Sequence, residues 1–193
     1  NECFTLESNG YIKGYDFASC PKDIVIPSKI GNKNIEGIRS GVFRSKGITS
    51  VKFEEGIKNV EGLAFKDNPI NQEELIFPAS LQTIGVNAFD GGNAKYNKLI
   101  FKGNTKIGDN AFTQNEIGEL SFEGRVNIDR MGFRNTKIGK LDLGNTESIG
   151  REAFIDASLT QDSLVFPKSV KTISSAAFQS NKIKVNDLII KGD

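Results

Sequence analysis

The stretch Leu75-Ile-Phe-Pro-Ala-Ser-Leu-Gln-Thr-Ile-Gly-Val-Asn-Ala-Phe89 joins two short phrases that recur along the chain. The first is an apolar tripeptide of the form L-x-F. The second is an aliphatic residue, three variable residues, a small residue and Phe. A period of 21–24 residues is typical of a solenoid, in which each repeat buries its apolar face only against its neighbours. The phenylalanines that end the second phrase are 22, 24, 23, 21, 21 and 24 residues apart: Phe43, Phe65, Phe89, Phe112, Phe133, Phe154 and Phe178.

The tripeptide follows each of these phenylalanines by about ten residues and predicts one short strand per repeat. Alternation of apolar and variable residues is a strand signal, and β-branched and aromatic residues suit it. An apolar residue three positions earlier, clear at Ile48, Ile117 and Ile138 and weaker at Tyr96, extends the phrase to L-x-x-L-x-L, the strand core of a leucine-rich repeat. The eight tripeptides begin at Ile24, Val51, Leu75, Leu99, Leu120, Leu141, Leu164 and Leu188.

Together these phrases resemble the BspA-like leucine-rich-repeat family of bacterial surface proteins. The resemblance is carried by the strand, a following Pro-x-Ser, then Ile-Gly and Ala-Phe, and it covers roughly residues 24 to 190. Leu164-Val-Phe-Pro-Lys-Ser-Val-Lys-Thr-Ile173 repeats the first part of this pattern almost letter for letter. The Gly after the Ile is not constant, because Arg39 and Glu61 replace it, so this position does not require a positive φ.

We therefore expect a single leucine-rich-repeat solenoid of about seven repeats over residues 24–193, right-handed and β-rich. One parallel sheet should carry one short strand per 21–24-residue coil, with turns, 3₁₀ segments or short strands on the opposite side. Of the 14 phenylalanines, 12 fall in the two phrases and only Phe4 and Phe17 lie outside them. The phenylalanines are thus expected to fill the core, not to form a ligand platform.

Residues 1–23 are expected to form an N-terminal cap of the same domain. Alternating residues on both sides of Asn9-Gly10 predict a β-hairpin. The only two cysteines, Cys3 and Cys20, lie in this segment and are either bonded to each other or two separate buried thiols. A bridge would close a loop of about 16 residues, worth roughly 3 kcal/mol, and would favour a secreted protein.

The other end of the chain has no comparable segment. The sequence stops at Asp193, directly after the last predicted strand. Because solenoids need polar caps at their ends, and an open strand edge invites pairing, the natural protein is expected to continue beyond Asp193.

Composition and residue types argue against several function classes. The net charge of +1 lacks the basic excess of a nucleic-acid binder, and no stretch is apolar enough to span a membrane. The chain has no histidine, which removes the usual general base and the commonest metal ligand. No cysteine pair has metal-ligand spacing, so no metal or other cofactor is expected and the chain is not expected to be an enzyme.

The variable residues of the strands should face outward over about 34 Å, from seven gaps of roughly 4.8 Å. The position before each strand leucine reads Glu, Lys, Glu, Lys in four successive coils, at residues 74, 98, 119 and 140. In-register strands would place these charges side by side, either as a stabilising ladder or as the flank of a binding strip centred on two isoleucines. The candidate partner-binding residues on this face are Lys52, Ile76, Ile100, Asp142 and Val165.

Arginine is concentrated in one part of the chain. Arg130 and Arg151 stand two residues after the repeat isoleucine in neighbouring coils and should stack, with Asp109 in the same position one coil earlier. Such a patch could hold an acidic glycan or protein, although interleaved carboxylates also allow a solvated flank of mixed charge. The candidate residues are Arg125, Arg130, Arg134 and Arg151.

What the resemblance implies is an extracellular, secreted or cell-surface module that binds proteins. Members of the family are associated with attachment to host or matrix proteins and to other cells. The alternative is a structural spacer that projects a neighbouring domain, in which case the charges on the strands would only stabilise the fold. The sequence leaves the partner, the binding face and the oligomeric state open.

Overall fold

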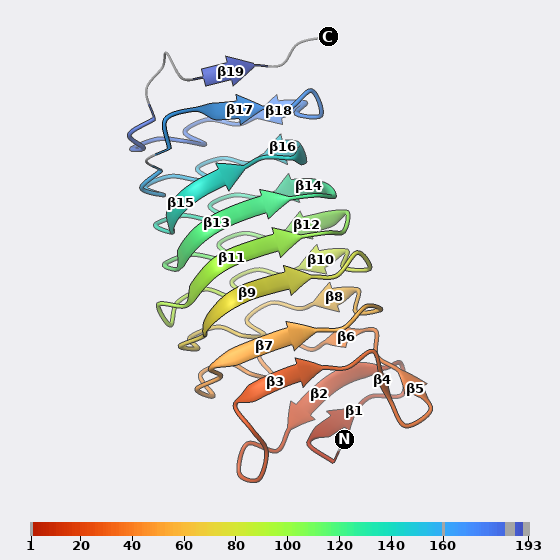
Figure 1. Ribbon diagram of the computed structural model, residues 1–193. Coiled ribbons are helices and arrows are strands. Elements are labelled where there is room, and N and C mark those ends of the chain that lie inside the picture. The colour runs from red at the N-terminus through yellow and green to blue at the C-terminus, as the bar shows by residue number, and fades with distance from the viewer. Residues whose placement is uncertain (1, 160, 184–187, 191–193) are drawn as a thin grey trace.

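The chain folds into a β-solenoid, as the repeats predict (Figure 1). The structure is a computed structural model that describes residues 2–159, 161–183 and 188–190, with the backbone alone described for 188–190. In Figure 1 the front strands run from left to right and the chain returns behind them as it climbs from the N-terminal end, so the coils are right-handed. Successive coils stack directly on one another, and the apolar core lies between the front and the back.

All eight tripeptides contribute strands at the front of the solenoid, although β15 ends one residue before the end of its tripeptide. The central strands are longer than the tripeptide because they also include the apolar position three residues earlier, as at Tyr96 and Ile117. Strands β9 to β15 pair in parallel and in register, so that Phe77, Phe101 and Phe122 lie beside one another. The front strands are β3 (Asp23–Ile26), β7 (Ser50–Phe53), β9 (Asn71–Phe77), β11 (Lys95–Phe101), β13 (Glu116–Phe122), β15 (Lys137–Asp142), β17 (Leu164–Phe166) and β19 (Leu188–Ile190).

The opposite side is more regular than the sequence suggests. Short extended pieces, most of which end on the isoleucine of the Ile…Ala-Phe phrase, join into one nine-stranded sheet, and the described residues contain no 3₁₀ turn there. Coil stacking forces this pairing, because each extended piece lies directly above the one before. The strands are β1 (Phe4–Leu6), β2 (Tyr11–Tyr15), β6 (Gly37–Ile38), β8 (Asn59–Val60), β10 (Thr83–Ile84), β12 (Thr105–Ile107), β14 (Arg125–Ile128), β16 (Asn145–Ile149) and β18 (Thr172–Ile173).

An unpredicted hairpin interrupts the first repeat. Strands β4 (Lys29–Ile30) and β5 (Lys33–Asn34) pair antiparallel across the two-residue turn between them. This insertion explains why the spacing from the first strand tripeptide to the second is longer than the spacings that follow.

The phenylalanines of the Ala-Phe phrase form a continuous stack through the core. The ring centroids of Phe89 and Phe112 lie 5.1 Å apart, those of Phe112 and Phe133 lie 5.2 Å apart, and the ring planes are nearly parallel. Strand phenylalanines meet this stack edge-on, as Phe101 meets Phe112 at 5.8 Å. All the repeat phenylalanines are buried except Phe178, which is half-buried in the last of these coils. The prediction of an aromatic core is therefore confirmed.

Left-handed backbone flanks each stacked phenylalanine. Around Phe112, the residues two before and two after it, Asn110 and Gln114, have φ of 55° and 63°. Equivalent positions in other coils hold Leu63 and Met131, for which this conformation costs on the order of 1–2 kcal/mol. The position after the repeat isoleucine, as at Gly85 and Arg39, is not left-handed, in agreement with the sequence analysis.

Buried asparagines three residues after a stacked phenylalanine link neighbouring coils. The Asn68 amide donates to the carbonyls of Phe43 and Phe65 at 2.7 and 2.8 Å, and its oxygen accepts from the backbone N–H groups of Lys46 and Ile48. Asn115 donates to the equivalent carbonyls of its own two coils. These side chains satisfy backbone groups that the turns leave without a partner.

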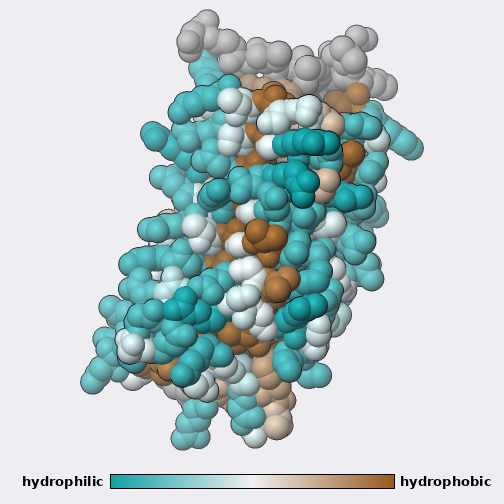
Figure 2. Space-filling view, turned by 180° about the vertical axis from the view of Figure 1, so that it is seen from behind, coloured by the Kyte–Doolittle hydropathy of each residue, from teal (hydrophilic) through white to brown (hydrophobic). Residues whose placement is uncertain are grey.

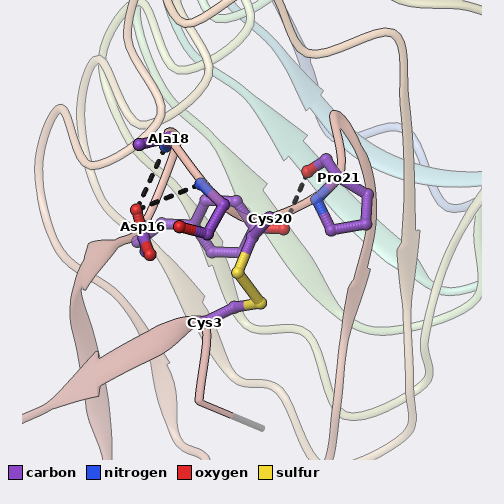
Figure 3. The surroundings of a disulfide bond; sticks show 7 residues. Cys3, Asp16, Ala18, Cys20 and Pro21 are labelled. Carbon is purple, nitrogen blue, oxygen red and sulfur yellow. Dashed lines mark hydrogen bonds between the residues drawn. A yellow bond between two sulfur atoms is a disulfide. The ribbon is translucent and has the colours of Figure 1, made fainter.

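The N-terminal segment covers the first coil, and its hairpin and disulfide are both confirmed. Strands β1 and β2 pair antiparallel, and β2 continues the nine-stranded sheet by pairing with β6. Cys3 and Cys20 form a disulfide, and the Asp16 carboxylate accepts hydrogen bonds from the backbone N–H of Ala18 and Ser19 beside it (Figure 3). The ring of Tyr15 closes the end of the stack against Phe43.

Removal of the disulfide, by the double substitution Cys3→Ala/Cys20→Ala, is expected to lower the free energy of unfolding by about 3 kcal/mol. The bridge closes a loop with a sequence separation of 17, and without it the cap loses this constraint in the unfolded chain. Urea unfolding followed by circular dichroism would measure the loss. The reduced wild-type protein serves as the control and should match the variant; an unchanged unfolding midpoint in both would contradict this role for the bridge.

Candidate binding face and groove

The variable residues of the front strands form one outward surface, which we call the strand face. Ile76, Ile100, Ser121 and Asp142 stand beside one another in register across β9 to β15. The two isoleucines are half-buried and Asp142 is exposed. Of the other predicted strand residues, Lys52 is exposed beside Val25, and Val165 is half-buried on β17.

Two ladders of alternating charge run along this face. Glu119 lies between Lys98 and Lys140 in the register, and its carboxylate is 2.9 Å from the Lys140 ammonium. Glu116 lies between two lysines in the same way, and the ammonium groups of Lys137 and Lys95 lower the pKa of its carboxyl. The predicted alternation of charge is thus confirmed, and the sequence analysis missed the second ladder. Exposed pairs of this kind contribute a few tenths of a kcal/mol each and fix the register.

The strand face is not continuous, because two glutamines interrupt the backbone ladder. Between β7 and β9 the Gln72 side chain accepts a hydrogen bond from the Val51 N–H at 2.8 Å and donates to the Val51 carbonyl at 3.0 Å. Between β15 and β17, Gln161 bonds the N–H and carbonyl of Leu141 in the same way. Both glutamines stand three residues before a strand leucine, where other coils have an apolar residue. A polar residue at this otherwise apolar position of the repeat is the feature of the sequence that could have indicated the two breaks.

Substitution Gln72→Leu is expected to lower the free energy of unfolding by about 1–2 kcal/mol, because the N–H and carbonyl of Val51 lose their partners. Hydrogen exchange of the Val51 amide should become faster. Urea unfolding and exchange measured by NMR would check both effects. Gln82→Leu is the control, since Gln82 is exposed on the other side of the coil. If Gln72→Leu were neutral, β7 and β9 would be able to pair directly and the bridging role of the amide would be wrong.

A groove opens on the strand face beside the first of these breaks. It encloses about 610 Å³ between β3, β7 and β9. Val25 and Ile76 contribute its apolar surface, and Asp23, Glu55 and Glu73 are among the charged residues that line it. The groove brings together two of the predicted strand residues, Lys52 and Ile76, but not Ile100, Asp142 or Val165.

The four clustered arginines are all exposed but do not form one free basic patch. Arg130 pairs with Asp109 at 3.6 Å, and Arg151 pairs with Glu152 at 2.9 Å. Arg130 and Arg151 lie on neighbouring coils, whose backbones are joined by a hydrogen bond from Met131 N–H to the Arg151 carbonyl. The other two differ: Arg134 contacts the Met131 sulfur, and Arg125 helps to lower the pKa of the Glu147 carboxyl, after the stronger effect of Lys171.

The rear face, formed by the nine-stranded sheet, also exposes apolar side chains. Figure 2 shows hydrophobic residues as a narrow, interrupted column with hydrophilic residues on both sides. Val86 and Ile173 are 51% and 49% exposed on this side of the solenoid. They lie several coils apart, so they do not form one contiguous patch.

The acidic side chains are distributed over the coils, and the two cysteines are bonded to each other in the cap. Within the described residues, no three His, Cys, Asp or Glu side chains gather into a group that could hold a metal ion. Among those same residues, no helix is long and apolar enough to cross a membrane.

Comparison with known families identifies the repeat. The family model described as "BspA type Leucine rich repeat region" matches in 6 copies, over residues 10–139 and 64–184. No curated protein and no solved structure matches the chain. The matched residues include most of the chain and coincide with the coils of the solenoid, and this family suggests a repeat module for interaction with proteins. This chain belongs to the BspA type leucine-rich-repeat family.

Proposed function

We propose that this chain is an extracellular protein-binding module of a bacterial surface protein, which mediates adhesion to host or matrix proteins or to other cells. The strand face is the proposed contact surface. The observation that carries the proposal is the in-register column of Ile76, Ile100 and Asp142, which presents aliphatic side chains between ladders of charge. A mixed surface of this kind suits a protein partner.

The disulfide and the family support the extracellular part of the proposal. Disulfides persist in oxidising compartments, and the Cys3–Cys20 bridge stands in the cap that closes the first coil. A leucine-rich-repeat solenoid is typically a binding scaffold and not an enzyme. Nearly all the repeat phenylalanines are buried in the core and cannot contact a partner. The outward residues of the strands therefore remain as the proposed contact surface.

The test is capture of host surface and matrix proteins by the immobilised chain, compared with the variant Ile76→Asp/Ile100→Asp. The wild-type chain should retain a defined partner that the variant loses, because two carboxylates would replace the aliphatic column. The control variant Val86→Asp/Ile173→Asp changes two exposed apolar residues on the rear face and should retain the partner. Equal binding by the strand-face variant would exclude the strand face as the contact surface.

The arginines provide a second proposed contact, with an acidic glycan or acidic protein. Arg130 and Arg151 lie on adjacent coils, and both side chains are exposed to solvent. Binding of heparin to the wild-type chain, reduced in Arg130→Gln/Arg151→Gln, would support this contact, and equal retention of both proteins would exclude it.

A structural spacer is the alternative function, and the pairing of the strand charges favours it. Lysines and glutamates of the two ladders pair with one another across neighbouring coils, which is what stabilisation of the solenoid requires. A spacer predicts that the isolated chain captures no host, matrix or cell-surface protein.

A further inference from the structure

The groove between β3, β7 and β9 lies at the first of the two interruptions of the strand face. Between β9 and β15 the strands are joined by a direct backbone ladder. Between β7 and β9 the Gln72 amide stands in place of that ladder. The groove lies at this interruption and is lined by residues of the coils that carry β3, β7 and β9, with Lys102 from the coil of β11.

Apolar side chains form part of the groove and are accessible. Val25 is 49% exposed, although it is a β-branched residue in the middle of β3. Ile76 is half-buried on the other side of the groove, and Pro78 follows it at the end of the strand. Removal of these surfaces from water would stabilise a complex with an aliphatic side chain, by about 25 cal/mol for each Å² buried.

The charges in the groove are unbalanced toward the acidic side. Its lining contains the carboxylates of Asp23, Glu55, Glu73 and Glu74 and the ammonium groups of Lys52 and Lys102. Among the described residues, only one of these carboxylates, that of Glu74, approaches a lysine, Lys98, and the distance is 4.0 Å.

The other three carboxylates are held by neutral donors. Asp23 accepts hydrogen bonds from the hydroxyls of Thr49 and Ser50 at 2.6 and 3.0 Å, which lower the pKa of Asp23. Glu55 accepts from two backbone N–H groups, and Glu73 accepts from the Asn97 amide at 2.6 Å. In the part of the chain that the structure describes, none of these three forms an ion pair. Their carboxylates are thus held in place by uncharged donors, in contrast to those of the ladders, which pair with lysines.

We infer that the groove receives an extended segment of the partner protein in which an aliphatic residue is flanked by lysine or arginine. The aliphatic side chain lies between Val25 and Ile76, and the cationic groups meet the carboxylates of Asp23, Glu55 and Glu73. This inference rests on the proposed function, since it names the kind of segment that the strand face binds. Electrostatic complementarity of this kind speeds association and sets specificity.

The test uses a labelled peptide, Gly-Lys-Ile-Lys-Gly-Lys-Ile-Lys-Gly, and the same peptide with Glu in place of each Lys. Fluorescence anisotropy measures their binding to the whole chain. The basic peptide should bind at least about tenfold more tightly than the acidic one. Its affinity should fall steeply when the ionic strength is raised to about 1 M, where the Debye length is about 3 Å.

Two pairs of substitutions locate the site. Asp23→Asn/Glu73→Gln should weaken binding of the basic peptide about tenfold, and Val25→Ser/Ile76→Ser should do so independently. The control Glu123→Gln/Asp156→Asn removes the same formal charge at exposed carboxylates outside the groove and should change the affinity less than about twofold. Equal weakening by the control pair, or equal binding of both peptides, would overturn the inference.

The outcomes separate this inference from the function on which it rests. A chain that captures a host protein through the strand face, but does not bind the basic peptide in the groove, keeps the proposed function and loses the inference. A chain that binds the peptide in the groove, but captures no host, matrix or cell-surface protein, keeps the inference about the groove and loses adhesion.

Discussion

Replacement of Phe112 by alanine is expected to lower the free energy of unfolding by about 3–5 kcal/mol. The side chain is 0% exposed, and its ring is stacked between those of Phe89 and Phe133 at 5.1 and 5.2 Å. The backbone of each coil is held by its neighbours, so the coils cannot collapse into the space that the ring leaves. Urea unfolding at equilibrium would measure the loss.

The position of Phe112 in the middle of the stack adds a second expected effect. A solenoid is stabilised by contacts between nearest neighbours, so a weak coil in the centre uncouples the coils on its two sides. The transition of Phe112→Ala should therefore be broader, with a lower apparent m-value than that of the wild-type chain. Phe4→Ala is the control, because Phe4 is only half-buried and lies in the cap. A loss below about 1 kcal/mol for Phe112→Ala would contradict the stacked core.

Substitution Asn68→Ala is expected to cost about 2–4 kcal/mol, because it leaves two buried carbonyls and two N–H groups without their partner. These are the carbonyls of Phe43 and Phe65 and the N–H groups of Lys46 and Ile48. Asn115→Ala is the matched control. Asn115 donates to two carbonyls, but its side-chain oxygen has no partner among the described residues, so its loss should cost about half as much.

The comparison of the two asparagines isolates the role of the acceptor oxygen. Both side chains are buried and stand three residues after a stacked phenylalanine, so the cavity left by alanine is of the same size. Thermal and urea unfolding of the two variants would provide the difference. If Asn115→Ala cost as much as Asn68→Ala, the hydrogen bonds to Lys46 and Ile48 would contribute nothing to stability.

The fold could be predicted from the sequence because one physical requirement recurs in every coil. Each repeat needs a small residue and a ring that stacks on its neighbours, and the spacing of Phe43 to Phe178 reports this requirement directly. The strand tripeptides are equally regular, since two of their three residues enter the same core. The cap followed from Asn9-Gly10 and from the two cysteines, whose positions have no counterpart in the repeats.

The rest of the fold depends on contacts between coils that a one-dimensional pattern does not encode. A rear strand such as β8 has only two residues, too few for a periodic signal, and exists because coils on both sides pair with it. The hairpin β4–β5 lies inside the first repeat and interrupts its period. The position three residues after the stacked phenylalanine holds Asn68, Asn115 and Asn181 but other residues in the remaining coils, so the asparagines give no regular signal.

The candidate site was predictable only in its outline. The outward direction of Ile76 and Ile100 and the alternation of the charges followed from strand geometry. The groove did not, because it arises where the Gln72 side chain replaces a backbone ladder, and one glutamine in an apolar column does not reveal which backbone groups it will bond. The alignment of Arg130 and Arg151 on neighbouring coils was predicted, but their pairing with Asp109 and Glu152 was not.

The most direct test of the strand face as the contact surface is lysine labelling of the chain with its captured partner bound, read by mass spectrometry. Lys52 and Lys98 are exposed on the strand face, and Lys106 and Lys171 are exposed on the side of the nine-stranded sheet. The partner should protect Lys52 and Lys98 and leave the labelling of Lys106 and Lys171 unchanged. Protection of Lys106 and Lys171, with Lys52 and Lys98 still labelled as in the free chain, would contradict binding through the strand face.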